Sequence, residues 1–344
     1  MSMEKAKSVA LAASEMIEPI DQARIVEPAR VVAADLIAVE AKLAHLLDSR
    51  ERLISEICHY LIDGGGKRLR PLFILLVHRG CGGNERTVVD AVDAAIALEL
   101  IHSATLLHDD IIDGGTLRRG KPSAFMRYGP GPTMVAGDYL FCRAFELCGR
   151  FEEHLVRTAA QACIQLTEGE VMEGRLRRNP AVSLADYMAV IGRKTGSLFA
   201  AGGKVAANLA GAPAQLSSAM ADLGSAIGLA FQMIDDLLDV LGPEAKTGKP
   251  VGSDLREGIP SLPVVLAVES DPELRSLFGN GRALDGADFA RAMQILRSPR
   301  LLARARAMAA EQVEVARNIL AQLKPSIYRD SLRVLIDEQI DREI

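Results

Sequence analysis

The sequence is poor in aromatic residues, which make up 4% of its 344 positions, and it contains no tryptophan. Folds built from β-sheets usually fill their cores with aromatic and β-branched side chains. A chain that is 49% hydrophobic and relies on alanine, leucine, valine and isoleucine suits closely packed helices better. The composition therefore predicts an all-α fold, and the length allows a single large domain.

Cysteines are also few. The chain has five, an odd number, and no two of them form a C-x-x-C pair. A disulfide framework usually shows an even number of cysteines in a short secreted chain. We therefore expect a reducing, cytoplasmic location.

Two further absences limit the partners of the protein. Acidic and basic residues are mixed along the chain, which has a net charge of −5, so no basic surface for nucleic acid is indicated. No apolar run approaches the roughly 18 to 20 residues that cross a bilayer, and the first apolar stretch is too short for a signal peptide. We expect residues 1–30 to form a flexible or peripheral lead and residues 31–344 to form the folded domain.

Three long segments carry apolar residues at i, i+3, i+4 and i+7, the spacing of an amphipathic helix. They cover residues 31–49, 87–113 and 214–241. Glycine and proline mark the breaks between helical segments, at 64–71, 114–122, 128–133, 241–252 and 257–263. No linker separates two domains, so we expect one bundle of about ten helices.

The motif D-D-x-x-D occurs twice, each time at the end of a predicted helix and ahead of a Gly-Lys-Pro sequence. HDDIIDGGTLRRGKPS begins at residue 108 and DDLLDVLGPEAKTGKP begins at residue 235. On a helix, each motif brings three carboxylates to one end of one face, where like charges repel. Divalent cations with oxygen ligands, Mg²⁺ above all, relieve such repulsion. The six carboxylates belong to Asp109, Asp110 and Asp113 in the first motif and to Asp235, Asp236 and Asp239 in the second.

Basic residues and glycines accompany both motifs. A solvated helix end would explain either motif alone, but two copies with basic loops favour a metal site. Guanidinium groups and lysine ammonium groups near Mg²⁺ are common ligands of a diphosphate, so we expect two anionic groups to bind at the mouth of the bundle. The basic residues are Lys67, Arg68, Arg70, Arg118, Arg119, Lys194 and Lys249.

From about residue 35 onward the chain resembles the trans-type polyprenyl diphosphate synthases. The resemblance rests on six segments in the family's order and at about its spacing: GGGKRLRP, LLHDDIIDGGTLRRGKPS, GDYLF, KTGSLF, FQMIDDLLD and GKPVGSDLREGIPSLP. It implies a single helical bundle of the isoprenoid synthase type, with a central cavity and both aspartate motifs at its mouth. It also implies a homodimer that condenses isopentenyl diphosphate head to tail with an allylic diphosphate, and it leaves room for transient membrane contact during product release.

The resemblance assigns roles to individual residues. It places the metal ligands at Asp109, Asp113 and Asp235, with Asp110 and Asp239 in support. It places the isopentenyl diphosphate site at Lys67, Arg70, His102 and Arg119, and the allylic site at Arg118, Lys194, Thr195, Gln232 and Lys249. Catalysis would then consist of stabilising the departing diphosphate, without a protein nucleophile. The implied catalytic set is Asp109, Asp113, Asp235, Arg118, Lys194 and Lys249.

One segment departs from the family pattern. The family commonly has a lysine and a threonine where this chain has Ile259 and Ser261. Serine keeps the hydroxyl group, whereas isoleucine removes a cation from the allylic site. This departure bears on the rate and on allylic affinity rather than on the fold.

Product length is predicted from the residues one turn before the first motif. Ala104 and Thr105 are both small, whereas a bulky aromatic side chain at this place tends to end elongation early in the family. Small residues favour a medium or long product, although they would also suit close helix packing.

Other functions stay open at this stage. Glu56 with His59 and Glu99 with His102 form two E-x-x-H patterns, which hold a di-iron centre in some helical bundles. The di-iron hypothesis would leave both aspartate motifs without a function. A non-catalytic subunit of a heteromeric synthase is the second alternative, and Ile259 is the one feature in its favour. A terpene cyclase would need one diphosphate site instead of two.

Overall fold

The computed structural model describes residues 27–66, 68–242, 251–282 and 284–340. Two residues of the expected site, Lys67 and Lys249, lie outside these ranges, as does most of the expected N-terminal lead. The first described helix, α2, begins at Pro28.

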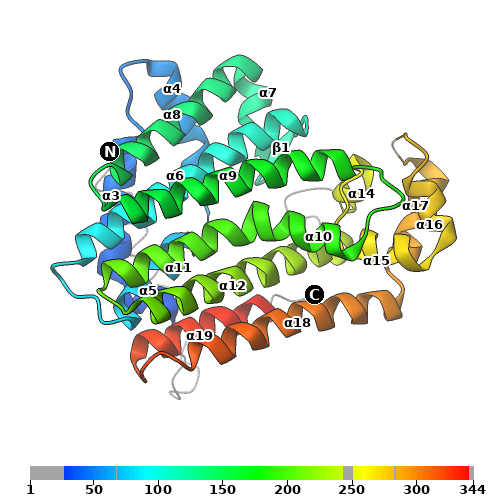
Figure 1. The fold of residues 1–344 in the computed structure, drawn as a ribbon. Coiled ribbons are helices and arrows are strands. Elements are labelled where there is room, and N and C mark those ends of the chain that lie inside the picture. Colours follow the sequence, from blue (N-terminus) through cyan, green and yellow to red (C-terminus); the bar gives the residue numbers. More distant parts are fainter. Residues whose placement is uncertain (1–26, 67, 243–250, 283, 341–344) are drawn as a thin grey trace, which may run out of the picture.

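The described chain is helical apart from one short hairpin and the connecting turns (Figure 1). Its first half contains α2 (Pro28–Val31), α3 (Ala33–Leu46), α4 (Arg52–Ile62), α5 (Leu69–Gly80), α6 (Val88–Ile112), β1 (Leu117–Arg118), β2 (Lys121–Pro122), α7 (Ala124–Tyr128), α8 (Pro130–Cys148) and α9 (Glu153–Leu176). Its second half contains α10 (Leu184–Ile191), the π-helix η1 (Gly192–Gly196), α11 (Ser197–Leu209), α12 (Ala214–Leu241), α14 (Ser253–Glu257), α15 (Leu262–Ser270), α16 (Pro272–Phe278), α17 (Gly286–Leu296), α18 (Pro299–Leu320) and α19 (Ile327–Ile340).

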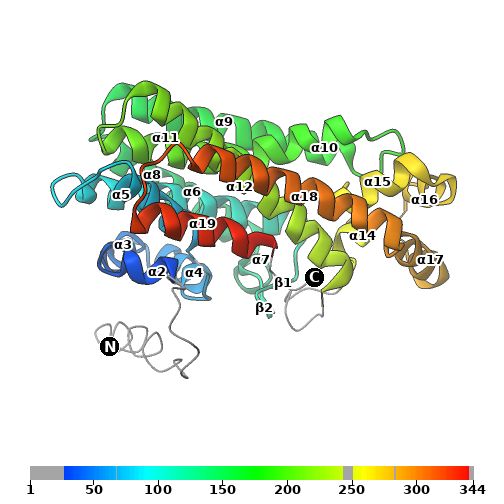
Figure 2. The same ribbon diagram turned by 90° about the horizontal axis from the view of Figure 1, so that it is seen from below.

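Long helices run side by side through the molecule. α12 packs against α11 and α18, and α6 packs against α8 and α5. Figure 1 shows α14, α15, α16 and α17 gathered at one end of these helices, and Figure 2 shows the same arrangement from below. The all-α prediction is confirmed.

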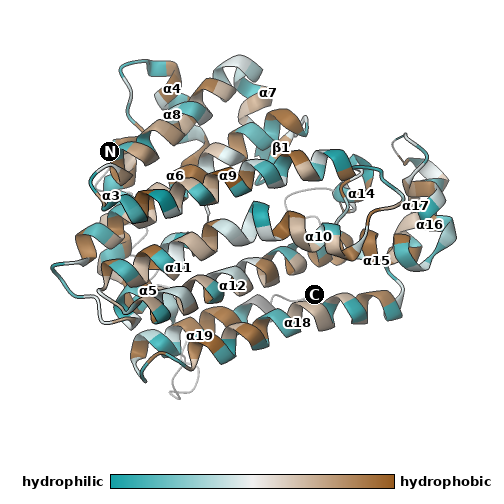
Figure 3. Cartoon of the chain, viewed as in Figure 1, coloured by the Kyte–Doolittle hydropathy of each residue, from teal (hydrophilic) through white to brown (hydrophobic). Residues whose placement is uncertain are grey.

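The core has two main parts, and α12 contributes to both. The larger part lies among α3, α5, α6, α8, α11 and the first half of α12, where Phe73 and Phe199 pack with ring centroids 5.9 Å apart. The smaller part includes the second half of α12 with α15 and α18. Apolar and polar residues are interspersed along most of the helices (Figure 3). No helix in the described ranges is long and apolar enough to cross a membrane.

The predicted helices agree with the observed ones to different degrees. Residues 214–241 form α12 over the expected range, and residues 87–113 contain α6. The segment 31–49 is broken near Val32, and its helix ends at Leu46. The glycine-rich segment 114–122, expected only as a loop, contains an antiparallel hairpin in which Arg118 pairs with Lys121.

Two glycines bring α11 and α12 into direct backbone contact. A Cβ atom on Gly203 would lie 2.0 Å from the carbonyl oxygen of Met220, and one on Gly224 would lie 2.2 Å from that of Phe199. Neither contact leaves room for a side chain. The close approach fixes the relative position of two helices that both contribute residues to the site described below.

Replacing Gly224 with alanine should therefore destabilise the fold. We expect Gly224→Ala to lower the free energy of unfolding by about 1–3 kcal/mol, because a methyl group would force two backbones apart. Gly174→Ala is the control, since nothing lies within 4 Å of a Cβ atom there, and alanine should raise helix stability by about 0.5–1 kcal/mol. Denaturant unfolding measures both. Equal effects of the two substitutions would contradict the packing argument.

Candidate active site

The first aspartate motif ends α6, and its three carboxylates have different surroundings. Asp110 is 2% exposed, whereas Asp109 and Asp113 are half-buried. The guanidinium group of Arg118, on β1, donates from Nε to both oxygens of Asp110, at 2.9 and 3.1 Å. Asp110 therefore anchors the hairpin, and it orients Arg118 at the same time.

The first carboxyl group of the motif, that of Asp109, has a shifted pKa. Burial raises the pKa of Asp109 to about 7, and Glu170 and Asp113 add to this, while Lys194 and Arg118 act to lower it. A carboxylate in such a setting gains from any further cation placed beside it. Asp109 is therefore a suitable metal ligand.

Lys194 stands on η1 between two acids of α9. Its Nζ atom lies 2.6 Å from Glu170 Oε2 and 2.8 Å from Glu173 Oε1. Burial acts to lower the pKa of Lys194, but Glu173, Asp109 and Glu170 outweigh it and raise that pKa. The lysine therefore stays charged beside the first motif. π-Helical turns of this kind often occur at functional sites.

The third carboxylate of the motif, that of Asp113, pairs with Arg177 in the C-cap of α9. The first motif is thus surrounded by cations from three other elements: the hairpin, η1 and the end of α9. Sequence reasoning named Arg118 and Lys194 but missed Glu170, Glu173 and Arg177. Their only signal was the charged run EGEVMEGRLRR, which reads as an ordinary exposed helix face.

The second motif, on α12, forms hydrogen bonds that hold neighbouring parts of the chain together. Asp236 is 4% exposed and accepts hydrogen bonds from Tyr187 Oη at 2.8 Å, Gln232 Nε2 at 2.9 Å and the backbone N–H of Leu262 at 2.9 Å. Burial raises the pKa of Asp236 to about 6, against the effect of these donors. Gln232 in turn accepts a hydrogen bond from Thr195 at 2.9 Å. Two residues of the expected allylic site, Thr195 and Gln232, are therefore bonded directly to each other, and the buried carboxylate of Asp236 holds Gln232.

Asp239, expected to support metal binding, also bonds to the chain. Its carboxylate accepts from Ser253 Oγ at 2.6 Å and from the backbone N–H groups of Ser253 and Asp254 at 3.1 and 3.3 Å. It thereby holds the start of α14 against the end of α12. Burial lowers the pKa of Arg70, and the charges of Glu99 and Asp235 act against this shift.

A second basic group surrounds His102 on α6. Burial lowers the pKa of His102 well below its ordinary value, and Arg70, Arg118, Arg119 and Arg68 lower it further. The imidazole is therefore neutral at pH 7. Arg70, His102 and Arg119 belong to the expected isopentenyl diphosphate site, so the fold brings these three residues of the set together.

Arg68 and Arg70 differ in their partners, although they are two residues apart. Arg68 donates to Glu40 at 2.7 Å and to Glu99 at 3.3 Å. Arg70 stacks on Phe199, with Cζ 4.9 Å from the ring centroid, and its buried Nε atom has no hydrogen-bond partner among the described residues. A buried donor without a partner is costly. Arg70 is therefore the arginine of this pair that suits an anionic ligand.

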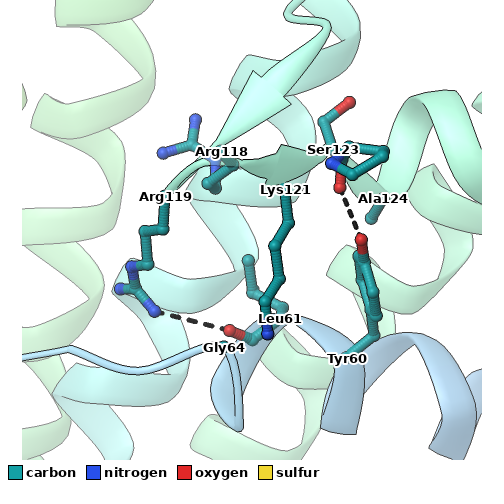
Figure 4. A pocket seen from close by; sticks show the side chains of 9 residues that line it. Tyr60, Leu61, Gly64, Arg118, Arg119, Lys121, Ser123 and Ala124 are labelled. Carbon is teal, nitrogen blue, oxygen red and sulfur yellow. Dashed lines mark hydrogen bonds between the residues drawn. The ribbon is translucent and has the colours of Figure 1, made fainter. Parts of the chain in front are cut away.

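The hairpin presents basic side chains to a small pocket (Figure 4). Arg119 and Gly120 form its turn with φ angles of 53° and 73°, the conformation of a type I′ hairpin turn. In Figure 4, Arg119 and Lys121 extend side by side toward the turn at Leu61, where Arg119 Nη1 donates to the carbonyl oxygen at 3.4 Å. Lys121 is a further basic residue that sequence reasoning did not assign.

The two residues expected to control product length lie inside the bundle. Ala104 is completely buried in the larger core, and Thr105, 9% exposed, donates its hydroxyl to the carbonyl oxygen of His102 at 2.8 Å. Neither side chain contributes a charged group. Their effect on function would therefore come from their volume.

Comparisons with known proteins identify the family of the chain. The family model described as polyprenyl synthetase matches residues 51–296. The chain is 35% identical over 320 residues to nonaprenyl diphosphate synthase of Mycobacterium tuberculosis, covering 91% of this chain and 95% of the relative. It is 37% identical over 252 residues to geranylgeranyl diphosphate synthase of Methanosarcina mazei, covering 71% and 76%.

A solved structure has the same fold over nearly the whole length. It is a polyprenyl synthase from Caulobacter crescentus in complex with calcium and isoprenyl diphosphate, with a TM-score of 0.88, 34% identity, and coverage of 95% of this chain and 100% of the other. With the family model matching well over half of its length, the chain belongs to the polyprenyl synthetase family.

Proposed function

We propose that the protein condenses isopentenyl diphosphate head to tail with an allylic prenyl diphosphate in a Mg²⁺-dependent reaction. The observation that carries this proposal is the pairing of two charged groups at the same end of the bundle. One consists of the first-motif carboxylates with Arg118 and Lys194, and the other of Arg70, His102 and Arg119. Together they offer separate places for two diphosphate groups.

The donor set fits Mg²⁺. Mg²⁺ usually takes one or two carboxylates and fills its other positions with water and phosphate oxygens. The described residues contain no group of three or more His, Cys, Asp or Glu side chains that could hold a metal ion, so diphosphate oxygens and water would have to complete its coordination. Asp109, Asp113 and Asp235 would hold the metal together with the allylic diphosphate. The bound metal would act as a Lewis acid that stabilises charge on the leaving diphosphate.

The reaction breaks the C–O bond of the allylic diphosphate, and the leaving group takes the bonding electrons. The double bond of isopentenyl diphosphate then forms the new C–C bond, and a proton is lost to give the product double bond, with diphosphate as its acceptor. Arg118 and Lys194 stabilise the negative charge that develops on the leaving group. Thr195 and Gln232 hold the allylic diphosphate in place, with Asp236 fixing the amide of Gln232.

The second substrate is bound by the basic group around His102. Arg70 offers an unpartnered Nε atom, and Arg119 is oriented by the hairpin turn. A neutral His102 can donate or accept a hydrogen bond without repelling the neighbouring arginines. Lys67, outside the described residues, would add a further cation.

Two alternatives fit the geometry less well. A di-iron centre would need His102 and Glu99 as ligands, but His102 lies among four arginines and Glu99 contacts Arg68. A non-catalytic subunit would not need the balanced charges around Asp109.

We also propose the cytoplasm as the location and transient membrane contact for product release. The support for the cytoplasm is that the chain has five cysteines, an odd number, with no C-x-x-C pair.

We further propose a homodimer that uses α8 and α9. Both helices expose large apolar side chains, which often mark a protein interface. They are Met134, Val135 and Phe145 on α8 and Ile164 and Val171 on α9. Ile164 and Val171 are two turns apart and therefore share one face of α9.

The metal assignment predicts loss of turnover when either motif is changed. A chelator should abolish condensation, and Mg²⁺ or Mn²⁺ should restore it. Asp109→Ala and Asp235→Ala should each lose about a hundredfold or more in kcat, because the leaving-group charge loses a stabilising partner. Glu311→Ala, on the exposed face of α18, serves as the control. Near-normal turnover in either motif variant, with the fold intact by circular dichroism, would refute the assignment.

The length assignment predicts shorter products from larger side chains at position 104. Ala104→Val, Ala104→Leu and Ala104→Phe add increasing volume at a fully buried position, where close packing leaves little room. The product distribution should shorten in that order, while the first condensation continues. Chromatography of the dephosphorylated products measures this. An unchanged distribution in folded, active variants would show that the chain grows along another face.

The dimer predicts sensitivity to charge on α9. Ile164→Glu combined with Val171→Glu should convert dimer to monomer, because two buried charges would lose hydration without a partner. Val315→Glu on α18, where the valine is 41% exposed, should leave the assembly unchanged. Sedimentation velocity distinguishes the two results. A dimer that survives the double substitution would place the interface elsewhere.

A further inference from the structure

Arg177 is a charged residue of the site, and the family resemblance assigns no role to it. It lies in the C-cap of α9, where the backbone leaves the helix with φ −57° and ψ 130°. Its guanidinium group pairs with Asp113, which is 64 residues away in the sequence. The side chains of Arg177 and Asp113 are 23% and 21% exposed, so the pair is reachable by a ligand and only partly screened by water.

The backbone around Arg177 is firmly held. The next residue, Arg178, has φ 53°, and its N–H group donates to the carbonyl oxygen of Gly258 at 3.0 Å. The Arg178 guanidinium donates to the carbonyl oxygens of Arg282 and Arg256. Gly258 permits this contact, because a Cβ atom there would lie 2.5 Å from Arg178 Cγ. The backbone that carries the Arg177 side chain is therefore held in place by the contacts of its neighbour.

The same contacts tie Arg177 to the loop that contains Ile259. The backbone of this loop is satisfied within the chain, since Ile259 N donates to Asp254 at 2.8 Å and its carbonyl oxygen accepts from Ser261 at 2.9 Å. The half-buried Ile259 side chain brings no charge to this side of the site. The segment that is hydrogen-bonded to this loop carries a positive charge, that of Arg177.

Charge around the first motif completes the argument. Arg177 pairs with Asp113 and lies close enough to Glu173 and Glu170 for their negative charges to act on it. Arg177 thus faces the same acids as Lys194. A guanidinium group has five N–H donors in a planar fork, so it can keep a bond to Asp113 and still donate to a phosphate oxygen.

We propose that Arg177 is a diphosphate-binding residue of the allylic site, and that it supplies from the end of α9 the positive charge that Ile259 does not. The inference rests on the proposed function, because it assigns Arg177 to one of the two substrates. A ligand-binding role of Arg177 and a merely structural role affect different measurable properties. A structural partner of Asp113 would change stability, whereas a ligand of the allylic diphosphate changes the binding of one substrate.

The first test is binding of inorganic diphosphate in the presence of Mg²⁺, measured by calorimetry on the full chain. Arg177→Gln should raise the dissociation constant about tenfold, the usual effect of losing one charge-assisted hydrogen bond. Arg177→Lys should recover part of the affinity. Arg175→Gln, an exposed arginine two residues earlier, is the matched control. Equal affinities of Arg177→Gln and Arg175→Gln would overturn the proposal.

The second test uses steady-state kinetics and a rescue. Arg177→Gln should raise the KM of the allylic diphosphate about tenfold and leave the KM of isopentenyl diphosphate within about twofold, because the charge serves one site. Ile259→Lys should restore allylic binding in the Arg177→Gln background by a larger factor than it adds to the original chain. Equal increases in both KM values would overturn the site assignment, and an equal effect of Ile259→Lys in both backgrounds would overturn the compensation.

The two proposals fail in different ways. An original chain that binds diphosphate but forms no prenyl product would refute the proposed function, and the calorimetric comparison of the Arg177 and Arg175 variants would still decide whether Arg177 binds diphosphate. An original chain that forms product while Arg177→Gln binds and turns over normally would refute the role of Arg177 alone.

Discussion

Carboxylates crowded at the end of a buried helix are costly unless cations stand beside them, and much of the architecture around α6 meets this requirement. Arg118 comes from the hairpin, Lys194 from η1 and Arg177 from the end of α9. The contacts that place these elements differ: Asp110 itself anchors the hairpin, the Arg178 N–H group bonds the end of α9 to Gly258, and η1 leads directly into α11, which packs closely on α12. The charge balance of the site therefore depends on the arrangement of the whole bundle.

The paired aspartates of each motif divide two tasks. Neighbouring residues on a helix point about 100° apart, so one carboxylate can face the site while the next faces the protein. Asp110 and Asp236, the second aspartate of each motif, are both nearly completely buried and are bonded to the chain. Asp109 keeps its raised pKa beside the lysine. In each D-D pair the second aspartate thus fixes the surrounding elements, and the first is the one proposed to bind a ligand.

The sequence predicted the fold well where a hydrophobic periodicity extended over many residues. The periodicity of 214–241 continues for many turns and ends in glycine and proline, so α12 was found over its full range. The hairpin at 117–122 was missed because strands of two residues have no measurable period. Glu173 and Arg177 were missed for another reason. They look like ordinary surface charges of α9, and only tertiary packing brings them to Lys194 and Asp113.

The separation between a charged end and an apolar interior suggests what limits product length. Each condensation yields a new allylic diphosphate, which can bind the same carboxylates and cations as the previous one, so the charged end does not distinguish chain lengths. The apolar tail gains about 0.8 kcal/mol for each buried CH₂ group, which favours continued growth inside the bundle. Growth must then end where volume runs out. Ala104 is small and completely buried in the larger core, so on the proposed path the first large side chain that the tail meets would set the limit.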